Sequence, residues 1–424
     1  MHLAIISTIA SALVPLVYGQ QNSSCPGVPG FRYGFAIDPQ FRAVKVAGGL
    51  TRPRGIARDR SGRLLIVESG KGITQHAVGT DGCITGSVVL LGLASLNHGI
   101  YLSPDESKLY ASTGTEVYSW SYDSTTGAVG NDQTTLVKGM RNSGHTTRTL
   151  AIPPSHPNLL VVSHGSDGNM DYPTVSPSAA RAIVKVFDLN STPAGGFDYV
   201  TQGWNAGYGL RNEVGLAFDA NEMLWGVENS GDDFVRTVDG VSTDIHTDNP
   251  ADELNYLGDV SKPNDQWYGY PACYTVGGPS EIKDATFALG DQFVLAPNIT
   301  FNDTTCIQAS VPPRLTLPAH SAPLDAKFDS VFQNLFVTLH GSWNRQPPSG
   351  YRVVRVPFTK ANDGSFTPVA ASNQVGFTDV FYPLDTTQCS AQTCTRPVAM
   401  VFDAAGRLYV TSDTSGELFL IEGA

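Results

Sequence analysis

Charged and sulfur-containing residues are scarce: Asp, Glu, Lys and Arg make up 16% of the 424 residues, and the chain has 6 Cys and 5 Met. No apolar run after residue 19 approaches the ~20 residues of a membrane-spanning helix. Apolar residues nowhere keep a 3.6-residue period beyond a turn or two, which argues against a parallel α/β fold. The sequence also lacks a GxSxG elbow, an HExxH helix, a P-loop and a nucleotide-binding βαβ unit, which disfavours the common hydrolases, metalloproteases and NAD or flavin dehydrogenases.

The N-terminus carries the one long apolar segment. Residues 1–19 are apolar and end in small residues, and they predict a signal peptide, followed by a single domain over residues 20–424. A membrane anchor is the alternative, which the shortness of the run and Pro15 disfavour. N-x-[ST] sequons begin at Asn22, Asn190, Asn298 and Asn302, and we expect two or three to be glycosylated in a secreted, extracellular protein.

The even number of cysteines suits an oxidising compartment. Fifteen pairings are possible in principle. Closeness in sequence favours Cys389–Cys394 and Cys273–Cys306, which leaves Cys25 to pair with Cys83. Because no CxxC occurs, we expect structural disulfides rather than a metal-thiolate or redox site. The net charge of −12 makes nucleic acid and anionic membranes poor partners.

A pattern of strand, turn and strand occurs six times. Each copy begins with a basic or amide residue ahead of a short apolar strand, and a second β-rich run follows most of the turns. The leading residues are Arg52, His98, His145, Asn212, His320 and Arg396, spaced by 46, 47, 67, 108 and 76 residues. Four strands need about 40–45 residues. The sequence therefore predicts an all-β fold, a six-bladed β-propeller.

The longer spacings predict insertions. The fourth interval has room for a blade and a long excursion across residues 241–315. Residues 32–48 supply further strands that could pair with residues 407–422 and close the ring, which would protect otherwise unpaired edges.

If these strands line the axis, their leading residues converge on one basic pocket in an acidic protein. Arg54, Arg396 and the adjacent Arg211–Asn212 pair supply guanidiniums that bind planar carboxylates in bidentate fashion. Any one of these arginines alone is more often a salt bridge at the rim. The set, placed alike in successive repeats, predicts a site for an anion with several charges.

Three further motifs offer chemistry. A neutral His145 could take a proton from a hydroxyl, and Asp167 could orient it, although a lone His is more often structural. The turn ENSGDDF, which contains Ser230 and Gly231, could give oxygen ligands to Ca²⁺ or be simply an acidic turn. The segment HGSWNR carries His340, Trp343 and Arg345, and its aromatic ring could stack on a planar cofactor or a sugar, or pack within a blade.

In order along the chain, NSGHTTRTL, SHGSDGN, GLRNEVGLAFD, ENSGDDF, WYGYP, HGSWNR and RPVAMVFDAAGRLYVTSD resemble the quinoprotein sugar dehydrogenases. These are six-bladed propellers that carry pyrroloquinoline quinone (PQQ). The resemblance is greater to the fungal PQQ-dependent pyranose dehydrogenases, auxiliary activity family twelve, than to the soluble glucose and L-sorbosone dehydrogenases. It covers essentially all of residues 20–424.

The resemblance implies a role for each matched residue. His145 matches the catalytic base, Arg211 and Asn212 match a pair on PQQ, and Arg396 matches an Arg on a PQQ carboxylate. Ser230 and Gly231 fall on two carbonyls that hold Ca²⁺. His340 departs from the family pattern, because the bacterial glucose enzyme has a Lys there. Asp167 stands one place from the family's acidic position, where this chain has Ser166, and His98 falls near a polar cofactor-side position.

The resemblance also implies a pyranose substrate such as L-fucose or 2-keto-glucose. Electrons would pass to an external acceptor, such as a cytochrome b or a copper oxidase partner, from a monomer. Two other classes remain open. A calcium-dependent six-bladed lactonase or esterase would place Glu, Asn and Asp on the axis, and a non-catalytic carbohydrate-binding propeller would depend on aromatics and not on His145.

Overall fold

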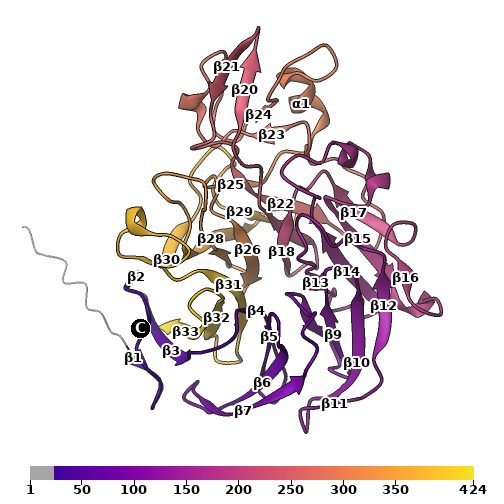
Figure 1. Cartoon of the computed structure of the whole chain (residues 1–424), viewed down its shortest axis with the longest axis vertical. Coiled ribbons are helices and arrows are strands. Elements are labelled where there is room, and N and C mark those ends of the chain that lie inside the picture. Colours follow the sequence, from indigo (N-terminus) through magenta and orange to yellow (C-terminus); the bar gives the residue numbers. More distant parts are fainter. Residues whose placement is uncertain (1–22) are drawn as a thin grey trace, which may run out of the picture.

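Six sheets surround a central axis in the computed structural model, which describes residues 23–424 (Figure 1). This arrangement confirms the predicted six-bladed β-propeller. The innermost strand of each sheet contacts the innermost strands on both sides, so the ring is closed. These strands are β4 (Pro53–Arg58), β8 (Ile100–Leu102), β13 (Leu150–Ala151), β18 (Glu213–Phe218), β26 (Pro323–Phe328) and β31 (Pro397–Phe402).

Every blade has a second strand after the turn, and this strand is mostly buried along its length. Both faces of this strand pack against neighbouring blades, which explains its continuous apolar sequence in place of polar alternation. The second strands are β5 (Leu64–Glu68), β9 (Lys108–Ser112), β14 (Leu159–His164), β19 (Leu224–Glu228), β27 (Asn334–Leu339) and β32 (Leu408–Ser412). Each pairs antiparallel with its inner strand.

The outer strands complete the blades. They are β6 (Gly72–Val78) and β7 (Ile84–Leu91); β10 (Val117–Asp123), β11 (Ala128–Val129), β12 (Thr134–Lys138) and β16 (Phe197–Asp198); β15 (Ile183–Asp188) and β17 (Trp204–Tyr208); β22 (Asp252–Gly258) and β25 (Leu315–Leu317); and β28 (Arg352–Lys360), β29 (Phe366–Pro368) and β30 (Thr378–Pro383).

The last blade is built from both ends of the described chain. Strand β3 (Phe41–Ala47) pairs antiparallel with β33 (Glu417–Gly423), as predicted, and β1 (Ser23–Ser24) adds to β3. Strand β2 (Phe35–Ile37) differs from the prediction because it pairs with β30 of the preceding blade. The N-terminal segment therefore joins two adjacent blades.

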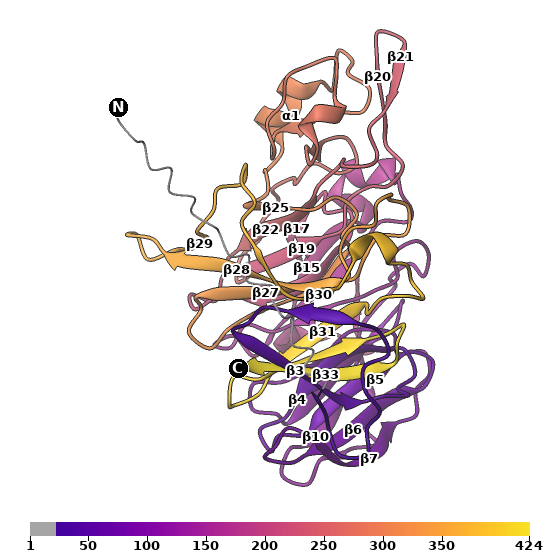
Figure 2. The ribbon, with the colours of Figure 1, turned by 90° about the vertical axis from the view of Figure 1, so that its left-hand side faces the viewer.

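The insertion after β19 forms a small extension at the top of Figure 1. It contains a hairpin of β20 (Val235–Val238) and β21 (Val241–Asp244), a pair of β23 (Tyr274–Thr275) and β24 (Gln292–Phe293), and helix α1 (Asp303–Ala309). It has an apolar core of its own that includes Phe234, Tyr274 and Phe293. The predicted excursion is not continuous, because β22 within it belongs to a blade; the side view shows the extension beyond the stacked strands (Figure 2).

The three predicted disulfides are confirmed: Cys25–Cys83, Cys273–Cys306 and Cys389–Cys394. The first fastens the N-terminal segment to the turn before β7, and the second fastens α1 to the segment just before β23, within the insertion. The third closes a small loop before β31. No helix among residues 23–424 is long and apolar enough to cross a membrane. The predicted signal peptide and the sequon at Asn22 lie outside the described residues.

Candidate active site

The predicted site residues gather at one end of the blades because inner and second strands run antiparallel. The start of an inner strand and the end of the second strand therefore meet at the same end. Two clusters form there. The Arg396 cluster consists of Arg54, His98, His340, Arg396 and Asp413, and the Arg211 cluster consists of His145, Ser166, Arg211, Asp232 and His320.

Asp413 organises the Arg396 cluster. Its two carboxylate oxygens lie 2.8 Å from Nη1 of Arg54 and 2.9 Å from Nε2 of His340. Burial works to raise the pKa of Asp413, but His340 and Arg54 outweigh it and lower that pKa. Burial also lowers the pKa of His340 to about 4, so this imidazole is neutral and donates its Nε2–H to Asp413. Arg54 and Asp413 thus neutralise each other.

Arg396 has no carboxylate in contact among the described residues. Its Nε and Nη2 donate to the carbonyl oxygens of His340 and Gly341 at 3.1 and 2.8 Å, and the guanidinium lies 5.7 Å from the centre of the Tyr351 ring. Burial lowers its pKa. A partly buried cation without a counter-charge favours an anionic ligand.

His98 adds an unsatisfied group to this cluster. Its side chain is buried, and its Nδ1 has no hydrogen-bond partner among residues 23–424. Burial and the nearby Arg54 lower the pKa of His98 well below its usual value, so the ring is neutral. A buried unpaired nitrogen is costly unless a ligand or water completes it.

His145 is held by Ser166. Its Nδ1 lies 3.0 Å from both the carbonyl oxygen and the hydroxyl oxygen of Ser166, while its Nε2 has no partner among the described residues. Burial, with Arg211 nearby, lowers the pKa of His145 to about 4. The ring is therefore a neutral imidazole at ordinary pH, and Nε2 is available as a base.

Arg211 presents a fork of donors in the same cluster. Its Nη2 lies 3.0 Å from Oδ2 of Asp232 and 3.1 Å from Oδ1 of Asn169, and its Nη1 donates to the carbonyl of Ser230. The Asp232 carboxylate also lies 3.4 Å from Nδ1 of His320. Burial opposes ionisation of Asp232, but His320 and Arg211 outweigh it and lower its pKa.

Asn212 is buried next to Arg211, and its side-chain oxygen lies close to Gly165. A Cβ at Gly165 would come within 2.5 Å of this oxygen and within 2.6 Å of the Cβ of His145. Glycine at this position therefore allows the loop after β14 to pack against both side chains.

The ENSGDDF turn is rigidly held. The backbone N–H of Ser230 donates to Oδ1 of Asp252 at 2.9 Å, and the other oxygen of Asp252 accepts from the Ser321 hydroxyl and the Ala322 N–H. A Cβ at Gly231 would lie 2.3 Å from the Phe234 ring, so glycine is required there. The turn directs the Ser230 carbonyl toward Arg211.

The remaining predicted residues lie nearby with other partners. Asp167 forms an ion pair with Arg141 at 3.2 Å, and no hydrogen bond joins its carboxylate to His145. Arg345 binds the carbonyl of Thr247 and the carboxylate of Asp248, in the insertion. Trp343 is 73% exposed, so its ring face is available for stacking and is not packed within a blade.

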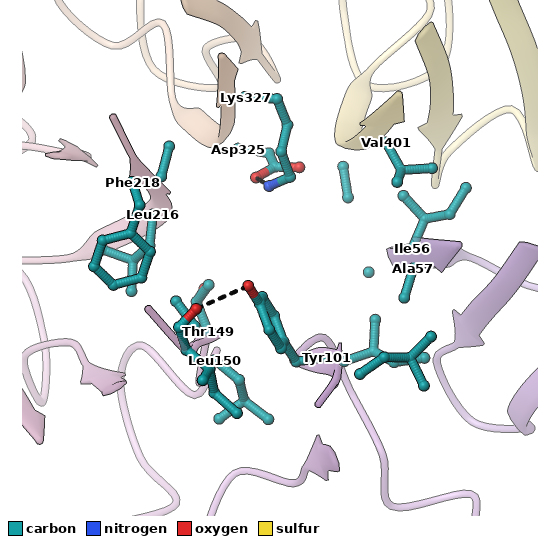
Figure 3. Close-up of a pocket in the computed structure, with 18 of the residues that line it drawn as sticks. Ile56, Ala57, Tyr101, Thr149, Leu150, Leu216, Phe218, Asp325, Lys327 and Val401 are labelled. Carbon is teal, nitrogen blue, oxygen red and sulfur yellow. Dashed lines mark hydrogen bonds and ion pairs between the residues drawn. The ribbon is translucent and has the colours of Figure 1, made fainter. Parts of the chain in front are cut away.

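A cavity of about 500 Å³ lies along the axis between the inner strands (Figure 3). Its labelled walls are mainly apolar, with Tyr101, Thr149 and the Lys327–Asp325 ion pair as polar exceptions. Of the predicted site residues it shares only His98. The cavity therefore begins at His98 and extends away from the other residues of the two clusters. The polar side chains that could bind a ligand lie outside it, beyond the end marked by His98.

The donors present fit a planar ligand with several carboxylates. Arg396 contacts no carboxylate among residues 23–424, and His98 has an unpaired nitrogen. Arg211 lies at the same end of the blades, but its N–H groups already donate to protein oxygens, including the Asp232 carboxylate. A calcium ion fits less completely. No group of three or more His, Cys, Asp or Glu among residues 23–424 is placed to hold a metal. Because Ca²⁺ takes six to eight oxygens, the carbonyls of Ser230 and Gly231 would need water or ligand oxygens beside them.

Fold and clusters together define a propeller with a basic, imidazole-containing site at one end of its axis. The chain belongs to the family described as TrAA12-like, whose model matches residues 35–424. This membership confirms the predicted resemblance to auxiliary activity family twelve.

The chain is 44% identical over 407 residues to a pyrroloquinoline quinone-dependent pyranose dehydrogenase of Coprinopsis cinerea, covering 94% of this chain but only 56% of that protein. The holo PQQ domain of the pyranose dehydrogenase from Coprinopsis cinerea superposes with a TM-score of 0.91 at 44% identity, covering 94% of this chain and 100% of the domain. The calcium structure of a Trichoderma reesei family AA12 protein gives 0.88 at 33% identity, covering 95% and 100%.

Several residues of the clusters escaped the sequence analysis as site residues. Asp232 and Asp413 follow second strands, so the same strand-end logic that selected Arg54 and Arg211 could have found them. His320 heads an inner strand, but the repeat pattern alone assigns it no chemical role. Ser166 occupies the family's acidic position, and a serine there gives no charge signal in the sequence.

Proposed function

We propose that this chain is a PQQ- and Ca²⁺-dependent dehydrogenase that oxidises a hydroxyl of a pyranose such as L-fucose or 2-keto-glucose. The observation that carries the proposal is His145: its ring is neutral and fastened through Nδ1, with Nε2 unpaired beside the Arg211 fork. Such a base next to an anion site suits removal of a hydroxyl proton. The similarity to the PQQ-dependent pyranose dehydrogenase of Coprinopsis cinerea supports the same conclusion.

The arginines would bind and orient the cofactor. Arg396, which contacts no carboxylate among the described residues, would take one PQQ carboxylate. Arg211, which is already paired with Asp232, would take another polar edge together with Asn212. Arg54 is already neutralised by Asp413, so its contribution to binding an anion would be smaller. The unpaired Nδ1 of His98 would form a hydrogen bond with a cofactor atom or a bound water.

When bound, PQQ would supply a hydride acceptor and Ca²⁺ would supply a Lewis acid, two functions that side chains do not provide. Ser230 and Gly231 would provide two carbonyl oxygens for the ion. His145 would take the hydroxyl proton at Nε2, and the exposed Trp343 would offer a face to the sugar ring.

Two other functions fit less well. A calcium lactonase would need acidic side chains converging on a metal, and the carboxylates of both clusters are instead paired with Arg or His. A non-catalytic sugar-binding propeller would have no use for a base fixed at His145.

The deciding experiment is the absorption spectrum of the purified chain mixed with PQQ and Ca²⁺, before and after adding L-fucose. We expect the spectrum of bound oxidised quinone to change to that of the reduced form. A quinone spectrum that sugar leaves unchanged would contradict dehydrogenase activity, while hydrolysis of a lactone would favour the alternative enzyme.

The acceptor and compartment complete the proposal. Electrons would leave to an external partner such as a cytochrome b or a copper oxidase, and the protein would be secreted as a glycosylated monomer. Of the described sequons, Asn190 and Asn298 are exposed, and Asn302 caps helix α1 through its side-chain oxygen. Supplying a cytochrome b and following its reduction would test the acceptor.

A further inference from the structure

We propose that Ser166 is the positioning residue for His145: it fixes which ring nitrogen carries the proton and directs the other nitrogen into the site. This inference rests on the proposed function, because it concerns the same base. Ser166 is fully buried and lies directly after β14, two residues beyond the end of that strand.

The tautomer follows from the partners of Nδ1. A carbonyl oxygen can only accept a hydrogen bond, so the contact between Nδ1 and the Ser166 carbonyl requires Nδ1 to carry the hydrogen. The Ser166 hydroxyl donates its own hydrogen to the Gly168 carbonyl at 2.7 Å, so toward His145 it too acts as an acceptor. Because Nδ1 carries the hydrogen in both contacts, Nε2 of the neutral ring carries a lone pair and no hydrogen.

The backbone of Ser166 is itself fixed on both sides. Its carbonyl also accepts from the backbone N–H of His145 at 3.0 Å, and its own N–H donates to the carbonyl of Arg211 at 2.7 Å. Gly144, with φ of +61°, passes so close that a Cβ there would lie 2.5 Å from the Ser166 carbonyl. Ser166 therefore ties the base to the arginine fork.

Within residues 23–424 no carboxylate hydrogen-bonds to the His145 ring. The charged groups that face His145 are Arg211 and Arg148, which disfavour its protonation, and Asp232, which favours it. A serine in this position orients the imidazole without adding a negative charge. The base therefore stays neutral and usable in acidic media, at the cost of lower basicity.

The first test is the tautomer itself, read by nitrogen NMR of the holoprotein labelled with ¹⁵N-histidine. The chain has 9 His, so the His145 signals are assigned by their loss in His145→Gln. We expect a protonated Nδ1 and an unprotonated Nε2 at pH 7. A protonated Nε2 would overturn the proposal without any Ser166 variant.

The second test uses two substitutions and a matched control. Ser166→Ala should slow single-turnover reduction of PQQ by about 2- to 12-fold, the effect of one neutral hydrogen bond, with unchanged PQQ affinity. Ser166→Asp places a carboxylate beside Nδ1 and should move the acid limb of the rate profile upward by about 1–3 pH units. Ser103→Ala, another buried serine with side-chain hydrogen bonds but in the turn after β8, should change neither.

The outcomes separate the two levels of the proposal. If His145→Gln reduces PQQ as fast as the unaltered protein, the assignment of the base fails. If His145→Gln is inactive but both Ser166 variants keep the rate, the pH profile and the ¹⁵N pattern, only the positioning role fails. Bound PQQ and melting temperature, measured on each variant, identify any that does not fold.

Discussion

Nη2 of Arg211 lies 3.0 Å from Oδ2 of Asp232, so the arginine reaches the site already paired with a carboxylate. Asp232 in turn contacts His320, whose pKa is raised: burial opposes its protonation, but hydrogen bonds to Asp232 and the His246 carbonyl outweigh it. Arg211, Asp232 and His320 thus form a row with the carboxylate in the middle, the Arg211 row.

Replacing Arg211 should weaken PQQ binding. In Arg211→Gln the fork is lost, and we expect a cost of ~1.5–3 kcal/mol, the range for a hydrogen bond to a charged group. The variant also leaves Asp232 without its main partner, so the control is Arg211→Gln combined with Asp232→Asn. Calorimetric titration with PQQ provides the affinities, and equal affinity in all variants would contradict the assignment.

Arg396 should matter more than Arg54. Arg54 is neutralised by Asp413, whereas Arg396 contacts only carbonyls and an aromatic ring. We expect Arg396→Gln to weaken PQQ binding more than Arg54→Gln, by at least about 1 kcal/mol, because the unpaired cation gains more from a carboxylate. The same titration compares them, and the reverse order would show that Arg54 is released from Asp413 on binding.

Uptake of PQQ should require Ca²⁺ and saturate at one molecule per chain. The Ser230 carbonyl accepts from Arg211, whose charge Asp232 partly neutralises, so the ion would add positive charge at this point. Calorimetry with and without excess chelator measures this requirement. If PQQ binds saturably and with equal affinity in the presence of chelator, PQQ binding does not require Ca²⁺.

The His145→Ala variant should bind PQQ but lose most of its turnover, by the ~10²–10⁴ that general-base assistance contributes. Because burial lowers the pKa of His145 to about 4, the unprotonated base is present above that pH. The rate of the unaltered protein should therefore rise between about pH 3 and 5 and then level. Stopped-flow reduction of bound PQQ by L-fucose measures both effects; a retained rate above roughly a tenth would exclude His145.

His164 offers a test of stability against pH. It is buried against the Tyr199 ring, and neither ring nitrogen makes a well-formed hydrogen bond within residues 23–424. Burial and the nearby Arg148 outweigh the carbonyls of Ala180 and Arg141 and lower the pKa of His164 well below 6.5. Below pH 6.5 the unfolded chain takes up a proton that the folded chain does not, so this residue costs stability as pH falls. Relative to the unaltered protein, His164→Phe should gain about 2 kcal/mol between pH 7 and pH 5, measured by urea unfolding.

The sequence predicted the propeller well because its signal is local and repeated. Each second strand, such as Leu64–Glu68, reads as a continuous apolar run, and each inner strand ends in a turn. The arginines were identifiable because charge in an apolar repeat stands out. The partners that tune them were not, since Asp413 meets Arg54 across 359 positions of sequence. Nor could periodicity show that β2 leaves its neighbour β3 to pair with a different blade.

The pairing of β3 with β33 has a consequence for the order of folding. During synthesis five blades can assemble as their strands emerge, but the sixth lacks its outermost pair until Glu417–Gly423 has left the ribosome. Until then β3 has an unpaired edge, which can pair with a strand of another chain and lead to aggregation. Arg396 and Asp413 belong to this last blade, so the ligand site is completed at the same moment as the ring.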